Sequence, residues 1–403
     1  MEIRSEKWQS CILLLHGVVA QLARASALQA EGRGFESRPL HSLLIVGIMI
    51  KITPESKVLI WGCSKEVRSG GAEVLNLLAS TLKRLGVDAK MFNWSYQMYE
   101  QPDYYKNLYD INCGSWEEIE DKDTTVMVLP EMMLEDPGHL KFFAGFKNVQ
   151  FVFWWLSSSF DYIEKDIKTS KRLLMNSLKG FENRSINAYE NEVCARDLLY
   201  YGLNNRVRLQ HGINDYYYTA PVQETKQNVV LFNGMKEKTK SYVEDCLIPI
   251  MPDIKFEGIY YLGPDNYRTK ADMCRIYDRC KVYIDFCEFE GRELMPREAA
   301  VRNCALLLGS HGCAETFDDY PIPEEYKVNR YTETPDEVAC KIRKLLTGYD
   351  TEIENFRFFK HKCYCEPLLW MNSIYSIFGP MIPNIDIRYS NREGNIQYGC
   401  LPE

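Results

Sequence analysis

The stretch of sequence that decides the fold is residues 281–315, KVYIDFCEFEGRELMPREAAVRNCALLLGSHGCAE. It begins with a β-branched and aromatic run, Val282 to Phe286, which is typical of a strand buried in a parallel sheet. A loop rich in carboxylates follows, and Pro296 is expected to open a helix, where its missing N–H costs nothing. A second apolar run, Ala305 to Leu308, is expected to be the next strand. This order predicts a βαβ unit with a ligand site at the carboxyl ends of its strands.

Two glutamates of this stretch, Glu290 and Glu298, are separated by seven residues in the run E-G-R-E-L-M-P-R-E-A. The run resembles the signature of retaining GT-B glycosyltransferases of the large sucrose-synthase-like family (glycosyl transferases group 1), usually E-G-F-G-L-P-x-x-E-A. The resemblance implies that Glu290 is catalytic and lies by the transferred sugar, and that Glu298 holds the nucleotide ribose. The alternative is a solvated acidic loop before an ordinary helix.

The residues around the two glutamates extend the resemblance and also depart from it. The run G-S-H-G-C-A-E resembles the family's next loop, which implies that Gly312 lies at the donor site. Glu293 stands where the signature has its second Gly, and the Pro comes one position later, at Pro296. A carboxylate near a diphosphate is repulsive unless a neighbour such as Arg292 neutralises it. We therefore expect Arg292 and Glu293 to be donor-binding residues, with Glu293 selecting the donor.

A turn near residue 233 is expected to follow the first strand of a second domain. In the resembled family, the corresponding turn holds an Arg just after its Gly and a Lys five residues later, and both grip the donor diphosphate. Here Met235 occupies the Arg position, Lys240 matches the Lys, and Lys236 supplies a charge from one residue along. Ammonium groups at a strand–helix junction suit a diphosphate as point charges. The alternative is a solvated basic helix start.

Two turns are expected to contribute to the first domain's side of the site. Gly70 and Gly71 stand in a loop between the strand 58–61 and the helix 72–85, and they fit the family's Gly-Gly-x-Glu loop, although a plain βα turn is the alternative. The run His211-Gly212-Ile213-Asn214 resembles the Asn-Gly-Val-Asp turn that ends the first domain in this family. We place His211 on the acceptor side, against the alternative of a structural histidine.

Composition limits the classes of function. The chain has 403 residues, a net charge of −8 and a pI near 5.5, which argues against a nucleic-acid binder. Its 14 cysteines never form C-x-x-C, which favours reduced thiols in a cytoplasmic protein. No apolar run reaches the ~20 residues needed to cross a bilayer, although a local patch leaves peripheral membrane contact open.

Residues 1–48 differ from the rest of the chain. The segment 17–41, GVVAQLARASALQAEGRGFESRPLH, resembles the peptide obtained when a transfer-RNA gene of a prokaryotic genome is translated by mistake. We expect 1–48 to be a disordered, mis-annotated leader and Met49 to be the true start. A weak secretory signal is the alternative, although His16 and Gln21 interrupt its apolar run.

Strands and helices alternate through the remaining sequence, which predicts parallel α/β sheets. The resemblance implies two Rossmann-like domains facing a cleft. The N-terminal domain, 49–218, would bind the acceptor and the C-terminal domain, 219–365, the nucleotide sugar. In the last segment, 366–403, a helix would cross back to the first domain before a tail. A surface insertion is expected at 93–123.

The implied reaction is transfer of a sugar from a nucleotide sugar to a glycan or lipid-linked acceptor with retention, without a metal or another cofactor. Two alternatives stay open. One is a non-catalytic nucleotide-sugar binder, and the other is a nucleotide-sugar epimerase of the same fold.

Overall fold

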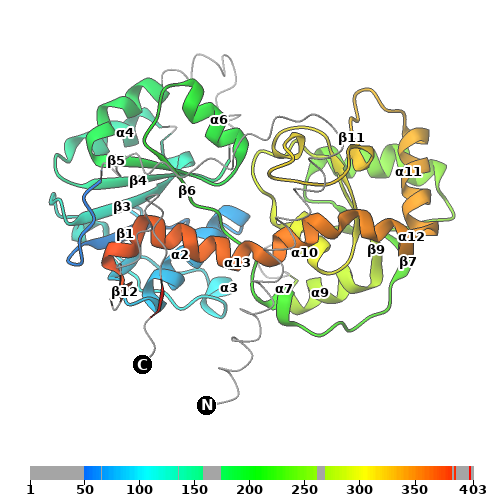
Figure 1. The fold of residues 1–403 in the computed structure, drawn as a ribbon, viewed down its shortest axis with the longest axis horizontal. Helices are drawn as coiled ribbons and strands as arrows, with labels where there is room; N and C mark the ends of the chain where they lie inside the picture. Colours follow the sequence, from blue (N-terminus) through cyan, green and yellow to red (C-terminus); the bar gives the residue numbers. More distant parts are fainter. Residues whose placement is uncertain are drawn as a thin grey trace. The chain divides into compact units, whose positions relative to one another are not determined.

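The computed structural model describes residues 50–64, 66–134, 136–157, 174–260, 268–383, 385–386 and 399–400. Figure 1 shows the chain with its elements labelled. The expectations for residues 1–48 lie outside the described residues.

The first sheet has six parallel strands in the order β2-β1-β3-β4-β5-β6. Strands β1 to β5 are buried almost throughout, as expected when helices cover both faces of a parallel sheet, whereas β6, at the edge, is only partly buried. Their bounds are β1 (Lys57–Trp61), β2 (Ala89–Phe92), β3 (Thr125–Pro130), β4 (Gln150–Trp155), β5 (Ser185–Tyr189) and β6 (Arg206–Arg208).

Some of the helices of this domain begin at side-chain caps. Ser69 caps α2 by accepting a hydrogen bond from the Ala72 N–H, and Asn191 caps α6 in the same way through the Cys194 N–H. The bounds are α2 (Gly70–Arg84), α3 (Asp103–Lys106), α4 (Pro137–Gly145), α6 (Glu192–Tyr200) and α7 (Tyr216–Thr219).

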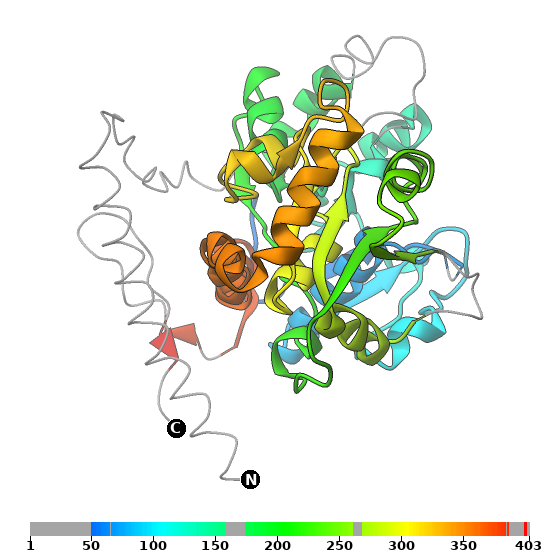
Figure 2. The same ribbon diagram turned by 90° about the vertical axis from the view of Figure 1, so that its right-hand side faces the viewer.

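The second sheet has five parallel strands in the order β11-β10-β9-β7-β8. Figure 2 shows helix α11, in orange, alongside these strands. The strand bounds are β7 (Gln227–Asn233), β8 (Lys255–Ile259), β9 (Cys280–Asp285), β10 (Ala305–Gly309) and β11 (Lys327–Val328). The helices are α8 (Glu237–Ser241), α9 (Lys270–Arg279), α10 (Leu294–Val301), α11 (Pro335–Thr347) and α12 (Tyr349–Glu352), and two short strands end the chain, β12 (Ile385–Asp386) and β13 (Gly399–Cys400).

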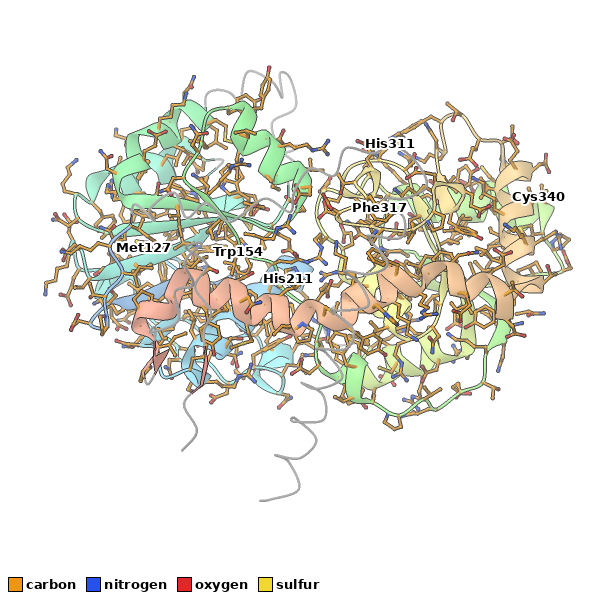
Figure 3. All side chains as sticks on the ribbon, in the orientation of Figure 1. Met127, Trp154, His211, His311, Phe317 and Cys340 are labelled. Carbon is orange, nitrogen blue, oxygen red and sulfur yellow. The ribbon has the colours of Figure 1, made fainter. Side chains whose placement is uncertain are left out.

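Helix α13 (Arg357–Phe378) belongs to both hydrophobic cores. Phe359 packs in the core of the second sheet, whereas Trp370 packs in that of the first. The Trp370 ring stacks on Trp154 of β4, with centroids 6.0 Å apart, and Trp154 is labelled in Figure 3. The expectation of a C-terminal helix that returns to the first domain is confirmed.

The helix α13 continues through Pro367, although a proline inside a helix usually kinks or ends it. Proline lacks the N–H that would bond the carbonyl four residues earlier, which belongs to Cys363. The Tyr218 hydroxyl donates to that carbonyl at 2.9 Å instead. Because a side chain supplies the missing donor, the helix does not have to end at the proline.

Three local expectations were wrong. Helix α10 begins at Leu294, so Pro296 is its third residue, still within the first turn, where no N–H has a helical partner. Gly70 and Gly71 form the first turn of α2 and not the loop before it. The stretch 93–123 is not only a surface insertion, because Tyr99, Tyr105 and Tyr109 are buried in the first core.

No helix in the described part of the chain is apolar over a length that would let it cross a membrane. The cysteines of that part carry free thiols, and most of them are buried.

Candidate functional site

A cavity of about 590 Å³ lies at the carboxyl ends of both sheets. Its wall includes residues that follow β1, β3, β4 and β5 of the first sheet and β7, β8 and β9 of the second. In each sheet the strand order reverses at one point, between β1 and β3 and between β7 and β9. Parallel α/β sheets bind ligands in the crevice at such points. The topology therefore places the candidate site where the two crevices open into one cavity.

Most of the site residues predicted from the sequence line this cavity, namely Gly70, Gly71, His211, Lys236, Glu290, Arg292, Glu293 and Glu298. The structure does not bring Lys240 or Gly312 to the wall. Lys240 is partly exposed and lies 3.6 Å from Glu237 in its own helix. Gly312 has a φ of +67°, and a Cβ there would come within 2.2 Å of the Phe289 carbonyl oxygen, so its backbone role alone requires glycine. The donor roles of Lys240 and Gly312 stay predictions.

The loop after β9, which carries Glu290, contacts the first domain. Ser157, just after β4, forms an isolated antiparallel bridge with Gly291. A Cβ on Gly291 would lie 2.5 Å from the Leu156 carbonyl oxygen, so only glycine permits this approach. Glu290 itself is half-buried and lines the cavity. The loop after β9 thus presents its carboxylate where residues of both domains meet.

Glu293 neutralises the lysine that was expected to bind phosphate. The Lys236 Nζ lies 3.1 Å from the Glu293 Oε1, and both side chains remain partly exposed, at 37% and 25%. Burial raises the pKa of Glu293, and Lys236 opposes that rise. Burial also tends to lower the pKa of Lys236. Nearby negative groups, with Glu293 first among them, outweigh burial and hold this pKa above its ordinary value. Met235, in the place of the family's arginine, is exposed.

Asp285, the last residue of β9, fixes the turn after β7. It is fully buried and accepts hydrogen bonds from Asn233 Nδ2 at 2.8 Å and from Thr239 Oγ1 at 2.9 Å. A buried carboxylate that accepts several hydrogen bonds orders the groups that donate to it. Asp285 therefore holds the turn of Lys236 beside the loop of Glu293.

Glu298 belongs to a group of charges contributed by both domains. Its Oε2 accepts a hydrogen bond from the Tyr277 hydroxyl at 2.9 Å. Lys270, at the start of α9, lies 2.8 Å from Glu73 of α2, which also accepts from the Tyr109 hydroxyl. Burial raises the pKa of Glu298, and Lys270 counteracts this. Glu298, the carboxylate predicted to bind the ribose, thus lies buried at the cavity wall, beside an ion pair that joins the domains.

A second charged cluster is sealed from solvent, and we call it the sealed cluster: Glu190, His211, Arg292, Arg297 and Glu366. Glu366 of α13 is paired with Arg292, and its Oε2 lies 3.1 Å from the Arg297 Nη1. Burial tends to raise the pKa of Glu366, but Arg297, Arg292 and His211 together hold it below the ordinary value. Arg292, expected at the donor, touches the cavity and also holds this cluster together.

His211, labelled in Figure 3, belongs to the sealed cluster and also lines the cavity. Its Nδ1 lies 2.8 Å from the Gly212 carbonyl oxygen, which can only accept, so this nitrogen donates. Its Nε2 lies 2.8 Å from the Glu190 Oε1. The two atoms are close but not aligned as a hydrogen bond, and among the described residues neither Glu190 oxygen accepts one. The structural alternative for His211 describes most of its contacts.

Glu131 is a carboxylic acid that the sequence analysis missed. It directly follows β3, lines the cavity and is almost fully buried. Burial raises the pKa of Glu131 to about 7, although Leu156 N–H, Ser157 N–H and the Ser157 hydroxyl all donate to it. The sequence did contain a signal for Glu131 as a site residue, namely its position at the carboxyl end of an apolar strand. Such a residue can exchange a proton near neutral pH.

Three further charged residues of the site could not be predicted from the sequence. Glu190, Lys270 and Glu366 meet their partners only through tertiary packing, and no local motif marks them. Among the described residues, no three His, Cys, Asp or Glu side chains gather as a possible metal site. Independence from metals and cofactors stays a prediction.

Comparison with known proteins identifies the fold of this chain but no family. No protein-family model matches the chain, and no curated protein matches it in sequence. Of the solved structures, one described as trehalose-6-phosphate from E. coli bound with UDP-2-fluoro glucose matches with a TM-score of 0.54 and 12% identity, covering 80% of this chain and 99% of that one.

Two further structures match similarly. Sucrose-phosphate synthase from Thermosynechococcus elongatus has a TM-score of 0.51 and 11% identity, over 79% of this chain and 98% of that one. Anabaena HepE in complex with UDP-glucose has a TM-score of 0.51 and 12% identity, over 80% and 99%. At such identities the likeness concerns the fold alone. With its two parallel sheets and the helix α13 that joins both cores, the protein has the GT-B fold predicted from its sequence.

Proposed function

We propose that the protein is a glycosyltransferase that moves a sugar from a nucleotide-sugar donor to a glycan or lipid-linked acceptor with retention. The observation that carries the proposal is the set of carboxylates at the shared cavity. Glu290 and Glu298 both line this cavity. Glu290 lies in the loop after β9, and Glu298 lies in the helix α10 that follows the loop. The GT-B fold and the nucleotide sugars bound to two of the similar structures support the same class of reaction.

In this proposal each domain has its own task. The C-terminal domain, 219–365, binds the nucleotide sugar, with Glu298 on the ribose and Lys236 near the diphosphate. The N-terminal domain, 49–218, binds the acceptor, and 366–403 contains the helix that returns to it. The bond from the sugar C1 to the diphosphate breaks, and the acceptor oxygen bonds to C1 on the same face. The acceptor hydroxyl passes its proton to the departing diphosphate oxygen, and Glu290 stabilises charge as it develops.

One observation favours a second candidate, a binder that keeps the nucleotide pocket without turnover. The ion pair between Lys236 and Glu293 occupies the lysine expected to stabilise the leaving diphosphate. Met235 provides no cation in the family's arginine position. A donor diphosphate would have to displace Glu293 from Lys236, or bind beside the pair with less electrostatic support.

A ligand screen followed by a turnover assay separates the two candidates. Calorimetry of the full chain with nucleoside diphosphates and nucleotide sugars identifies the nucleotide, and release of the nucleoside diphosphate then reports turnover. We expect binding together with slow donor hydrolysis, which Glu290→Ala abolishes. Binding without turnover for any donor would make the protein a binder. No binding of any nucleotide would refute both candidates.

We further propose a cytoplasmic location, without a nucleic-acid partner and with at most peripheral contact to a membrane. The acidic net charge and the reduced thiols expected from the sequence support this.

A further inference from the structure

A second cavity, of about 470 Å³, lies at the opposite edge of the second sheet from the candidate site. Its wall includes Lys226, Asp278 and Asn303, which stand within two residues of the starts of β7, β9 and β10, so it adjoins the amino ends of these strands. The first turns of α13 form another part of the wall. None of the described residues lines both cavities. A cavity of this volume suits a small organic ligand.

The wall of this second cavity carries more positive than negative charge. Arg302 is neutralised by Asp278, whose Oδ2 lies 2.6 Å from its Nη2. The other charged groups are the cations Lys226, Arg357 and Lys360 and the exposed carboxylates Glu224 and Glu354. Glu354 lies 3.9 Å from Arg357, and both of these side chains are 68% exposed, so water screens the pair. Among the residues that the structure describes, the two lysines donate only to uncharged acceptors.

Lys226 supplies charge to the second cavity and not hydrogen bonds. Its Nζ donates to the carbonyl oxygens of Tyr277, Cys280 and Arg302 at 2.7, 2.8 and 2.9 Å. These bonds use the three N–H groups of the ammonium. They hold it at the C-terminal ends of α9 and α10, where the helix dipoles favour a cation. The positive charge of Lys226 is therefore fixed beside the cavity.

Three residues of α13, namely Arg357, Lys360 and His361, supply hydrogen-bond donors to the same cavity. Their spacing of three and four residues puts them on one face of the helix. The Lys360 Nζ donates to the Asn303 Oδ1 and keeps two further N–H groups for a ligand. Asn303 has a φ of +59° and is the left-handed residue that follows the end of α10. The end of α10 thus fixes the ammonium of Lys360 at the cavity.

The cations of this wall lie close enough to act on one another. Burial lowers the pKa of Lys360, Glu354 opposes this, and Lys226 adds to it. Burial likewise lowers the pKa of His361, and Arg357 and Lys360 lower it further, against Glu354. Like charges gathered at a half-buried cavity repel one another, and a bound anion removes this repulsion.

We propose that the second cavity is an anion site for a small phosphate-bearing molecule, with Lys360 and Arg357 donating to the phosphate and Lys226 adding its charge. A phosphate dianion suits an ammonium and a guanidinium together better than a singly charged anion does. Two segments connect the domains, 209–226 and α13, and both line this cavity. The bound anion therefore ties the two connections together and stabilises the folded chain. The site is separate from the proposed function, because no residue of the candidate site belongs to it.

Titration calorimetry of the full chain with inorganic phosphate tests the site, with the ionic strength held constant by sodium chloride. We expect saturable binding that chloride does not reproduce. Lys360→Gln should weaken it about tenfold, the loss expected for one charge-assisted hydrogen bond, and Arg357→Gln a few-fold. Arg343→Gln removes a surface arginine that pairs with Asp253 and is the matched control, with the affinity of the wild type. Phosphate should raise the melting temperature of the wild type and the control, but not that of Lys360→Gln.

Lys236→Gln distinguishes the two cavities in the same titration. Phosphate binding that persists in Lys236→Gln and is weakened in Lys360→Gln assigns the anion to the second cavity. Binding that is lost in Lys236→Gln and unchanged in Lys360→Gln would place the anion in the candidate site and overturn the proposal. So would the absence of phosphate binding to the wild type, or an equal response to chloride. Circular dichroism verifies that each variant is folded, and the exposed Arg357 keeps the test possible if Lys360→Gln is not. Nucleotide binding and turnover do not enter, so the proposed function stands or fails separately.

Discussion

Two adjacent residues, Arg292 and Glu293, have opposite environments. The Arg292 side chain is 1% exposed and is paired with Glu366 in the sealed cluster. The Glu293 side chain is 25% exposed and forms its ion pair with Lys236 at the cavity. One ion pair is part of the interior, and the other is accessible to a ligand. Charge and spacing in a sequence are therefore not enough to separate a binding residue from one that holds the fold.

The difference has an energetic basis. A buried ion pair requires all its members, because removal of one leaves an uncompensated charge in a medium of low polarity. A half-exposed pair contributes little to stability, since water screens either charge when its partner leaves. We therefore expect substitutions in the sealed cluster to affect folding, and substitutions at the cavity to affect ligands.

The largest effect should come from breaking the sealed cluster. Arg297→Ala leaves the buried Glu366 without one of its two arginines and should lower the free energy of unfolding by about 3–5 kcal/mol. Urea denaturation measures this. The double variant Arg297→Met/Glu366→Met removes both charges and should recover part of the loss. A loss below about 1 kcal/mol for Arg297→Ala would mean that the cluster is not sealed in solution.

Glu131 sharpens the comparison, because among the described residues it has hydrogen-bond donors but no ion pair. Folded Glu131 keeps its proton up to a pH of about 7, whereas the unfolded carboxyl loses it near 4.5. The resulting contribution to stability is complete below pH 4.5 and is lost as the pH rises through 7, by about 3 kcal/mol. Unfolding free energies of wild type and Glu131→Gln across this range measure it. Identical pH slopes in the two proteins would contradict the raised pKa.

Glu290→Ala tests whether the cavity carboxylate acts in the transition state. The turnover rate should fall about 100-fold, while donor affinity changes only a few-fold, because only interactions that strengthen in the transition state accelerate the reaction. The control is Glu288→Ala in the same loop. Glu288 pairs with Lys238 and Arg330 and does not line the cavity. Equal losses in both variants would show that the loop, and not the Glu290 carboxylate, is what matters.

Glu298→Gln addresses the nucleotide. If Glu298 accepts hydrogen bonds from the ribose hydroxyls, the variant should bind the nucleotide more weakly by about 1–3 kcal/mol, the value of a charge-assisted hydrogen bond. Calorimetry with the nucleotide found in the screen measures this. Tyr277→Phe removes only the hydroxyl that donates to Glu298 and should have a smaller effect. Unchanged affinity in Glu298→Gln would refute the ribose assignment.

The smallest effect is expected from Glu293→Gly, which restores the usual residue of the motif. Stability should change by less than about 1 kcal/mol, because the pair with Lys236 is partly exposed. The freed lysine should favour the diphosphate, so the nucleoside diphosphate found in the screen should bind a few-fold more tightly while its monophosphate does not, and the preference among nucleotide sugars should change. Weaker binding of this diphosphate in the variant would show that Glu293 supports the nucleotide instead of opposing it.

The sequence was sufficient for the alternation of strands and helices, because the central strands, such as β3 and β10, are apolar runs. It also located Glu290, Glu293, Glu298 and Lys236 at one cavity, since carboxyl ends of neighbouring parallel strands share an edge. It could not reveal that Glu366 would reach Arg292 across 74 positions, because such a pairing depends on how α13 packs. The buried role of Tyr105 was likewise hidden, as a polar and aromatic segment reads as surface until its packing is known.

The shared helix α13 has a consequence for biosynthesis. The last strand of the first sheet ends at Arg208, but that sheet's core includes side chains of α13, which ends at Phe378. A ribosome adding roughly 5–20 residues per second needs on the order of 10–30 s to make the intervening chain. During that interval the surface that later receives Trp370 has no cover. The nascent first domain can therefore complete its core only when translation is almost finished.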